Sequence, residues 1–271
     1  MRALLDTAIA AAEAAGRLLA ARSRSMGEVR RKGRSTDLVT DADVASGVEI
    51  CRMIAAEAEG ARFVVEEPEV CGRAGVTPGT LADPEVWVID PLDGTTSFVH
   101  GYPCWSVSVA LLREGEPVLG VVRAEPSDET YAAAAGLGAT LNGAPVSCSQ
   151  QSDPCAALLG TGFPYDRGAT LDAQLRVLAR FLRLPVHDIR RDGSAAIDCC
   201  HVACGRTDAF WEFALQPWDT AAGVVIAREA GALVTDLTGA PWRAEELDIL
   251  IANPALHPLL LAEIAEEIRP Q

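Results

Sequence analysis

Two carboxylates, Asp90 and Asp93, follow an apolar segment over 86–89 whose Val, Trp and Ile residues predict a buried strand. Carboxylates crowded in this way repel each other unless a cation lies between them. Mg²⁺ takes such oxygen ligands, usually one or two carboxylates together with water and substrate phosphate. The Gly-Thr-Thr string at 94–96 adds backbone N–H groups and hydroxyls, the donors that a phosphate needs. The stretch therefore predicts a magnesium site beside a phosphate at the carboxyl end of a strand, where open α/β sheets bind ligands.

The same stretch also fits a strand that ends in an Asx turn, in which Asp and Gly serve only the turn geometry. Pro91 fixes its own φ and has no N–H to donate, so the strand is expected to stop there. The string Asp-Pro-x-Asp-Gly, taken alone, fits both interpretations equally well.

Other carboxylates stand where predicted elements begin or end. Glu66 and Glu67 end the apolar strand 62–67, a pattern that by itself usually marks a solvated strand end. Asp43 lies three residues after Thr40 and ahead of an apolar run, an arrangement typical of a helix cap. A carboxylate at a helix N-terminus satisfies the helix dipole and can also hold a metal-bound water, so both roles stay open for Asp43.

Two further predicted helices open on small or acidic residues. Gly193 and Ser194 begin a helix that runs to about residue 205, and the free N–H groups of its first turn suit an anion or a polar ligand. Asp219 lies in the first turn of a helix that follows Pro217. An ordinary N-cap role fits Ser194 equally well, whereas an N-cap role alone does not account for the string around Asp219.

Periodicity and turn residues give the remaining elements. Residues 69–84, rich in Gly, Pro and Thr, are expected to form a surface loop, and the glycine string 136–143 lacks the spacing of a nucleotide-binding loop. Helices are expected over 3–22, after 43, over 170–184, 194–205, after 217 and over 255–268, and strands over 62–67, 86–90, 105–112, 117–123, 129–135, 157–164, 186–190, 208–213, 234–236 and 249–252.

Composition narrows the class of protein. The 271 residues are 49% hydrophobic and carry a net charge of −15, which indicates a globular chain and argues against a nucleic-acid-binding surface. No targeting segment or membrane span is expected, so a cytoplasmic protein is predicted. The eight cysteines show no disulfide framework. The group Cys199, Cys200, His201 and Cys204 lacks the second ligand pair of a zinc site, so buried free thiols are the better interpretation.

The strings taken together resemble the signatures of the inositol monophosphatase family, Mg²⁺-dependent phosphomonoesterases that include fructose bisphosphatase and nucleotide 3′-phosphatases. The resemblance runs from Lys32 to Asn253 and rests on the string 86–98, on Glu66-Glu67 and on the string 215–223. It implies an α/β (α+β) fold, a layered αβαβα sandwich. It also implies two packed halves, 1–145 and 146–271, that form one compact unit and commonly a homodimer.

The resemblance implies a role for each matching residue. Implied metal ligands are Glu66, Asp90, Asp93 and Asp219 with the backbone carbonyl of Leu92, and they would hold two or three Mg²⁺. Implied substrate contacts are Gly94, Thr95, Gly193, Ser194, Ala195, Glu212 and Asp219, and implied supporting residues are Lys32, Asp43 and Glu67. Glu66, Thr95 and Asp90 would be catalytic, with Glu66 and the Thr95 hydroxyl helping a metal-bound water to attack the phosphate in line.

Two strings depart from the commonest family pattern. Ser97 replaces an Asn, and 123–126 replaces an aromatic-Asn/Asp-Pro string, which bears on the substrate rather than on the chemistry. The expected substrate is a small phosphate monoester, first inositol 1-phosphate. Histidinol phosphate, fructose 1,6-bisphosphate and 3′-phosphoadenosine phosphate are the alternatives. A catalytically inactive binding protein on the same scaffold is the competing class, and neither nucleic acid nor membrane is an expected partner.

Overall fold

The computed structural model describes residues 1–23, 29–31 and 38–268. Its helices are α1 (Arg2–Ser23), α2 (Asp41–Glu57), α3 (Val70–Ala74), α4 (Thr95–His100), α5 (Ala169–Arg183), α6 (Ala195–Ala203), α7 (Pro217–Glu229) and α8 (His257–Ile268). Its strands are β1 (Val29–Arg31), β2 (Leu38–Thr40), β3 (Arg62–Val65), β4 (Thr77–Pro78), β5 (Glu85–Asp93), β6 (Ser106–Arg113), β7 (Glu116–Ala124), β8 (Glu129–Ala134), β9 (Ala139–Leu141), β10 (Ala144–Pro145), β11 (Leu158–Thr161), β12 (Asp188–Arg190), β13 (Ala209–Glu212), β14 (Leu233–Thr235) and β15 (Ile249–Ala252).

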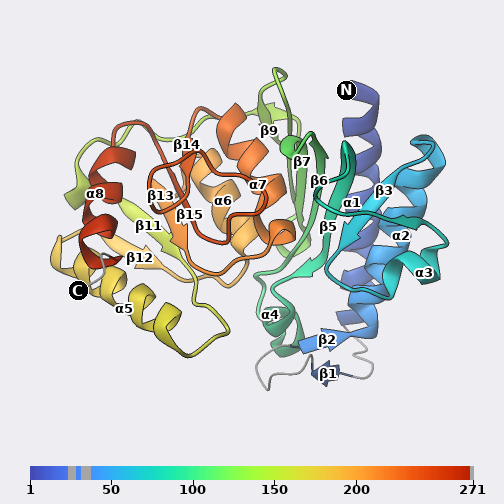
Figure 1. Cartoon of the computed structure of the whole chain (residues 1–271), viewed down its shortest axis with the longest axis horizontal. Helices are drawn as coiled ribbons and strands as arrows, with labels where there is room; N and C mark the ends of the chain where they lie inside the picture. Colours follow the sequence, from blue (N-terminus) through green and yellow to red (C-terminus); the bar gives the residue numbers. More distant parts are fainter. Residues whose placement is uncertain (24–28, 32–37, 269–271) are drawn as a thin grey trace.

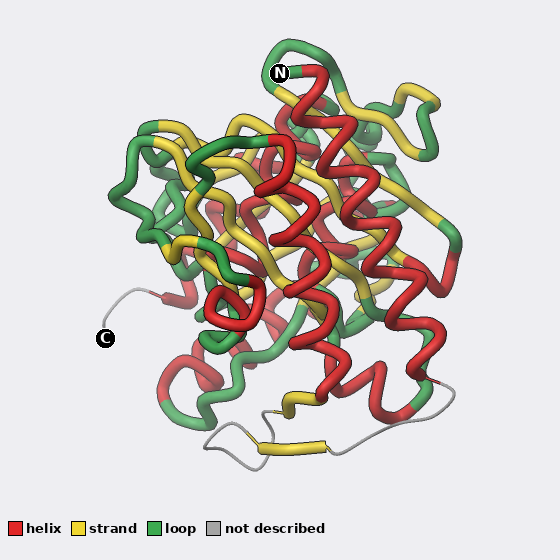
Figure 2. Tube along the Cα trace, turned by 90° about the vertical axis from the view of Figure 1, so that its right-hand side faces the viewer, coloured by secondary structure: helices red, strands yellow, loops and turns green. Residues whose placement is uncertain are grey.

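Helices and sheets alternate in five layers (Figure 1). Within the described residues, an eight-stranded sheet has the order β10-β9-β8-β7-β6-β5-β3-β4, and a five-stranded sheet has the order β12-β11-β13-β15-β14. Helices α1 and α2 cover the outer face of the larger sheet, as the side view in Figure 2 shows. Helices α6 and α7 lie between the sheets, and α5 and α8 cover the far face of the smaller one. The predicted αβαβα sandwich is confirmed.

The period-two alternation of β5 separates two layers of the core. Val86 and Val88 point to the side of α6 and α7, whereas Trp87 and Ile89 belong to the cluster under α1 and α2. All four side chains are buried, because a strand covered on both faces is apolar throughout. This burial fixes the register of β5 and therefore the place at which its two aspartates emerge.

The strand does not stop at Pro91, and that prediction is wrong. β5 continues to Asp93, and its antiparallel pairing with β6 shifts register between Asp90 and Asp93. Such a bulge leaves residues of one strand outside the ladder, so the missing N–H of Pro91 costs no hydrogen bond there. The bulge also bends the strand at the point where the carboxylates leave it.

The predicted surface loop over 69–84 is likewise wrong in part. It contains the short helix α3, which ends at Gly75 with a φ of 73°, and the edge strand β4. Five residues of helix and two of strand are too short to leave a periodic pattern in the sequence. The glycine string 136–143 runs through the hairpin of β9 and β10.

The two sheets are joined by a close approach of helix to strand. A Cβ atom placed on Gly120 of β7 would lie 2.3 Å from the carbonyl oxygen of Ala222 in α7, so only glycine fits there. Strands of the larger sheet lie before residue 146, and strands of the smaller sheet lie after residue 157. We propose that 1–145 and 146–271 are the two halves of the chain, packed across this contact.

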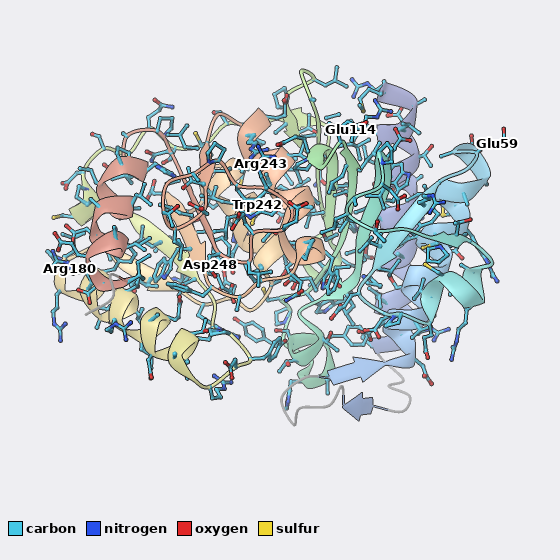
Figure 3. The ribbon with its side chains drawn as sticks, viewed as in Figure 1. Glu59, Glu114, Arg180, Trp242, Arg243 and Asp248 are labelled. Atoms are coloured by element: carbon cyan, nitrogen blue, oxygen red, sulfur yellow. The ribbon has the colours of Figure 1, made fainter. Side chains whose placement is uncertain are left out.

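Ion pairs and buried thiols complete the fold away from the site. Arg180 of α5 forms ion pairs with Glu263 and Glu266 of α8, which hold the outer helices together at the surface (Figure 3). All eight cysteines are free, and Cys199 and Cys200 are buried in the core. None of the helices in the described part of the chain has the length and hydropathy needed to cross a membrane.

Candidate active site

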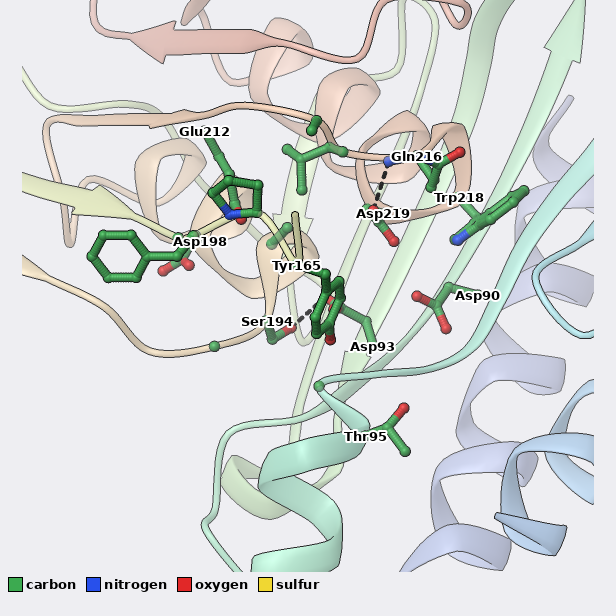
Figure 4. Close-up of a pocket in the computed structure, with 18 of the residues that line it drawn as sticks. Asp90, Asp93, Thr95, Tyr165, Ser194, Asp198, Glu212, Gln216, Trp218 and Asp219 are labelled. Atoms are coloured by element: carbon green, nitrogen blue, oxygen red, sulfur yellow. Dashed lines mark hydrogen bonds between the residues drawn. The ribbon is translucent and has the colours of Figure 1, made fainter. Parts of the chain in front are cut away.

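A cavity of about 540 Å³ lies at the carboxyl end of β5, between α4, the start of α6 and the start of α7 (Figure 4). This volume is in the range that holds a small organic ligand. Its polar lining includes Glu66, Asp90, Asp93, Asp219, Thr95, Ser194, Asp198, Glu212 and Arg191. The side chains come from residues 66–95 and 162–219, so segments far apart in the sequence form the cavity together.

Three aspartates converge on one side of the cavity. Asp90 and Asp93 come from the bulged end of β5, and Asp219 comes from the first turn of α7 (Figure 4). Burial raises the pKa of Asp90 well above its usual value, and repulsion from Glu66, Asp93 and Asp219 raises it further. Burial and the charge of Asp93 likewise raise the pKa of Asp219. The cluster is therefore unfavourable as a set of bare anions.

Asp93 is oriented by the other half of the chain. Its Oδ2 accepts a hydrogen bond of 2.6 Å from the hydroxyl of Ser194 and one of 2.8 Å from the N–H of Ala196. Burial raises the pKa of Asp93 to about 6, although these two hydrogen bonds oppose the rise. Ser194 is also the N-cap of α6 and accepts a 3.3 Å bond from Ile197 N. The capping interpretation of Ser194 and its place at the site are both correct.

The other two aspartates are held by their own turns. The N–H of Leu92 donates to Oδ1 of Asp90 at 2.9 Å, inside the bulge. The N–H of Gln216 donates to Oδ2 of Asp219 at 2.7 Å, in a capping arrangement at the start of α7. Asp219 lies at the third helical position rather than at the N-cap. Each carboxylate thus keeps one oxygen free of these bonds and faces the cavity.

Thr95 links the supporting carboxylate to the bulge. Its hydroxyl lies 3.3 Å from Oδ1 of Asp43 and 3.1 Å from the carbonyl oxygen of Leu92, and it donates to these acceptors. Asp43 is fully buried on α2, and Thr95 is the first residue of α4. A hydroxyl that donates to a carboxylate presents its lone pairs to another donor, such as a water in the cavity.

Two features of this turn require glycine at position 94. Its φ is 90°, a left-handed conformation that other residues rarely adopt. A Cβ atom would also lie 2.9 Å from the carbonyl oxygen of Cys104 and 3.1 Å from that of Gly193. The segment that carries Thr95 therefore passes close to the loop before α6, and a side chain would separate them.

Glu212 occupies another wall of the cavity, at the end of β13. Burial, followed by the negative charge of Asp93, raises its pKa to about 8, and Arg191 opposes the rise. A Cβ atom on Gly162 would lie 2.1 Å from Oε2 of Glu212, so the glycine makes room for this carboxyl group. The wall is suited to hydroxyl groups, which can donate to and accept from a carboxyl group.

A family model described as the inositol monophosphatase family matches residues 1–269. The chain belongs to the inositol monophosphatase family. It is 39% identical over 261 residues to an inositol-1-monophosphatase of Synechocystis, a match that covers 96% of this chain and 88% of the relative. It is 35% identical to a protein named Nus factor SuhB from Escherichia coli, over 99% of this chain and 98% of that one. The solved structure of inositol monophosphatase from Anabaena superposes with a TM-score of 0.86 at 36% identity, covering 98% of this chain and 96% of that one.

Membership in this family supports a phosphatase activity acting on a small phosphorylated substrate and, in general, dependence on magnesium. Every residue that the sequence assigns to metal or substrate lies on the cavity wall, namely Glu66, Asp90, Leu92, Asp93, Gly94, Thr95, Gly193, Ser194, Ala195, Glu212 and Asp219. Of the supporting residues, Asp43 reaches the site through Thr95, and Glu67 is buried without lining the cavity. Lys32 lies outside the described residues.

Sequence reasoning gave no role to several residues of the wall. Phe163, Tyr165, Arg191 and Trp218 also line the cavity, and Tyr165 and Trp218 are labelled in Figure 4. A position within two residues of a motif residue, Gly193 or Asp219, is the one sequence signal that singles out Arg191 and Trp218. Asp198 lies three residues after the start of a helix, where an ordinary buried or capping aspartate is also common. Its position in the sequence therefore gives no sign of a place at the cavity.

The donors present fit a hard divalent cation. No lysine or arginine forms an ion pair with Asp90, Asp93 or Asp219 within the part of the chain that the structure describes. The group offers only oxygen atoms, which are the ligands that Mg²⁺ prefers. Buried anions that repel one another are stabilised by such an ion, so this arrangement is adapted to one.

Proposed function

We propose that this protein is a Mg²⁺-dependent phosphatase that hydrolyses inositol 1-phosphate to inositol and phosphate. The observation that carries the proposal is the convergence of three aspartates, one buried and two half-buried, without a cationic partner among the described residues, beside the turn of Gly94 and Thr95. Such a cluster needs cations, and cations in turn provide the positive charge that an acidic protein needs to hold a phosphate.

Glu66, Asp90, Asp93 and Asp219, with the carbonyl oxygen of Leu92, would hold two or three Mg²⁺. When bound, Mg²⁺ lowers the pKa of its water and neutralises charge on the phosphate and on the leaving oxygen. Asp90 and Asp93 lie in β5 and Asp219 in α7, and Glu66 directly follows β3, where its N–H bonds to the carbonyl oxygen of Ile89.

The residues around Thr95 would position the attacking water. The Thr95 hydroxyl donates toward Asp43 and the Leu92 carbonyl, so its oxygen is free to accept a hydrogen bond from a water in the cavity. Glu66 lines the same part of the cavity and would accept the water's proton. The N–H groups of Gly94 and Thr95 would hold the phosphate while the water displaces the alcohol in line, without a covalent enzyme intermediate.

Substrate choice would depend on the opposite wall. Glu212, Gly193, Ser194 and Ala195 line the part of the cavity where the alcohol must lie if the phosphate is at Gly94. Several hydroxyls of a polyol can bond to a carboxyl group and to other polar groups of the wall at once, whereas a simple alkyl or aryl group cannot. These contacts favour inositol 1-phosphate over a phosphate monoester whose alcohol carries no further hydroxyl groups.

Comparing two substrates tests the proposal. With Glu212→Ala, kcat/KM for inositol 1-phosphate should fall, whereas that for p-nitrophenyl phosphate should scarcely change because its leaving group has no hydroxyls. An unchanged ratio would remove the support for a polyol. A panel with histidinol phosphate, fructose 1,6-bisphosphate and 3′-phosphoadenosine phosphate then ranks the alternatives, and inhibition by Li⁺ is a further expectation.

Absence of Mg²⁺-dependent turnover on every ester would instead indicate a binding protein on this scaffold. One relative is named Nus factor SuhB, a name that does not describe a phosphatase, so the binding-protein alternative is tested alongside the phosphatase. The net charge of −15 does not favour direct contact with nucleic acid. The homodimer and the cytoplasmic location stay predictions.

A further inference from the structure

A second group of side chains with the atoms that metal ions bind lies at the start of α6, and one of its members, Asp198, lines the cavity. One ligand atom each from Asp192, Asp198 and His201 lies within 4.8 Å of the others. None of the three belongs to the proposed Mg²⁺ ligands. Asp198 lines the cavity wall, on the side of Glu212 rather than of Asp90 (Figure 4).

The start of α6 brings the three side chains together. Asp198 and His201 are three residues apart on the helix and therefore share a face. Asp192 lies in the loop just before the N-cap residue Ser194. Nδ1 of His201 is 3.8 Å from Oδ2 of Asp192, which is too long for a hydrogen bond. Two ligands of one metal ion are separated by about 3.0–3.5 Å when each bond is about 2.1 Å, so a small movement suffices.

Of the three residues, Asp198 has a buried carboxylate oxygen that lacks a binding partner among the described residues. It is 2% exposed, and its Oδ1 is buried without a hydrogen-bond partner. Burial raises the pKa of Asp198 well above its usual value, and the charge of Asp192 raises it further. The charge of Arg191 opposes this rise, but no hydrogen bond from Arg191 to Asp198 is formed in the described structure. A buried carboxylate without a partner is strongly unfavourable, and nearly all buried polar groups in proteins are satisfied. The side chain is thus held ready for a group that the protein does not itself supply.

His201 supplies a neutral nitrogen ligand. Burial lowers its pKa, and the charge of Arg206 lowers it further, so the imidazole keeps a lone pair at neutral pH. One imidazole with two carboxylates suits Zn²⁺ or a similar transition-metal ion, whereas Mg²⁺ prefers oxygen ligands alone.

We propose that Asp192, Asp198 and His201 form a transition-metal site on the cavity wall, separate from the Mg²⁺ carboxylates. Three protein ligands leave the fourth position of a tetrahedral ion open. Because Asp198 borders the cavity, water or a polar group of a bound ligand can reach an ion held there. The site does not depend on the proposed substrate, and its occupancy is measurable without turnover.

Zinc content tests the site directly. The full chain is equilibrated with Zn²⁺ in saturating Mg²⁺, passed through a desalting column and analysed for metal. His201→Gln should retain about one Zn²⁺ fewer per chain than wild type, whereas the exposed His187→Gln should retain the wild-type amount. Asp192→Asn, at a side chain 28% exposed, is a second variant that spares the core.

Two outcomes of the zinc measurement decide whether the transition-metal site exists. Loss of one Zn²⁺ in His201→Gln and in Asp192→Asn, with Mg²⁺-dependent hydrolysis of p-nitrophenyl phosphate retained, supports the site. Equal zinc in wild type and in either folded variant would overturn it. Folding of each variant is checked by its unfolding transition in the absence of metal. Failure of the phosphatase proposal would appear as absent turnover in wild type and would leave the zinc difference unaffected.

Discussion

The hydroxyl of Ser194 donates a 2.6 Å hydrogen bond to Oδ2 of Asp93, across 101 residues of sequence. One partner ends strand β5 of the larger sheet, and the other caps helix α6, which lies between the sheets. A single contact therefore couples the packing of the two halves to the orientation of a proposed metal ligand. It also lowers the pKa of Asp93, against the rise caused by burial.

Ser194→Ala should lower both stability and metal affinity. Loss of an N-cap and of a buried hydrogen bond costs about 1–2 kcal/mol of unfolding free energy. The pKa of Asp93 should rise above its value of about 6, so Mg²⁺ binding should weaken most on the acidic side of neutrality. Urea unfolding without metal and Mg²⁺ titrations at pH 6 and pH 8 measure the two effects. Equal Mg²⁺ affinity in variant and wild type at pH 6 would contradict the coupling.

Thr95→Ala should reduce kcat far more than it raises KM. The hydroxyl is fixed by Asp43 and Leu92 and would act on the attacking water, so its loss should cost about 10²-fold or more in kcat. Thr96→Ala is the matched control, because Thr96 is the neighbouring threonine and is exposed. A change confined to KM would make Thr95 a phosphate-binding residue only.

Stability of the metal-free protein should fall as pH rises from about 4.5 to about 8. The folded-state pKa of Glu212 is raised to about 8 from 4.5, so in this window the folded state holds a proton that the unfolded state has released. Each pH unit should then cost about 1.4 kcal/mol for this group alone. Glu212→Gln should remove that part of the slope, as urea unfolding in EDTA at several pH values can measure. Identical slopes in both proteins would show that Glu212 titrates normally.

Sequence patterns predicted which side chains come together better than the contacts that hold them. Asp90, Asp93 and Asp219 line one cavity, because each stands at the end or start of a strongly patterned element, and such ends meet at one edge of a layered α/β fold. The continuation of β5 past Pro91 was missed because a bulge depends on pairing with β6, which no local pattern records.

Contacts between elements that are far apart in the sequence could not be predicted from local sequence patterns. The bond from Ser194 to Asp93 depends on how α6 packs between the sheets, and the cap alone gives no sign of it. The same holds for the orphaned oxygen of Asp198, since an aspartate in the first turn of a helix normally faces water. Burial of such groups follows from the assembled layers.

Turnover of p-nitrophenyl phosphate, with and without Mg²⁺, by wild type and by Asp90→Asn tests the central claim most directly. Wild type should require Mg²⁺ and lose activity in EDTA. Asp90→Asn should lose about 10²-fold or more at saturating Mg²⁺. Its metal-free stability should equal or exceed that of wild type, because the change removes repulsion among buried carboxylates. Near-wild-type turnover by Asp90→Asn, or turnover by wild type without a divalent cation, would contradict the assignment of this cluster as a catalytic magnesium site.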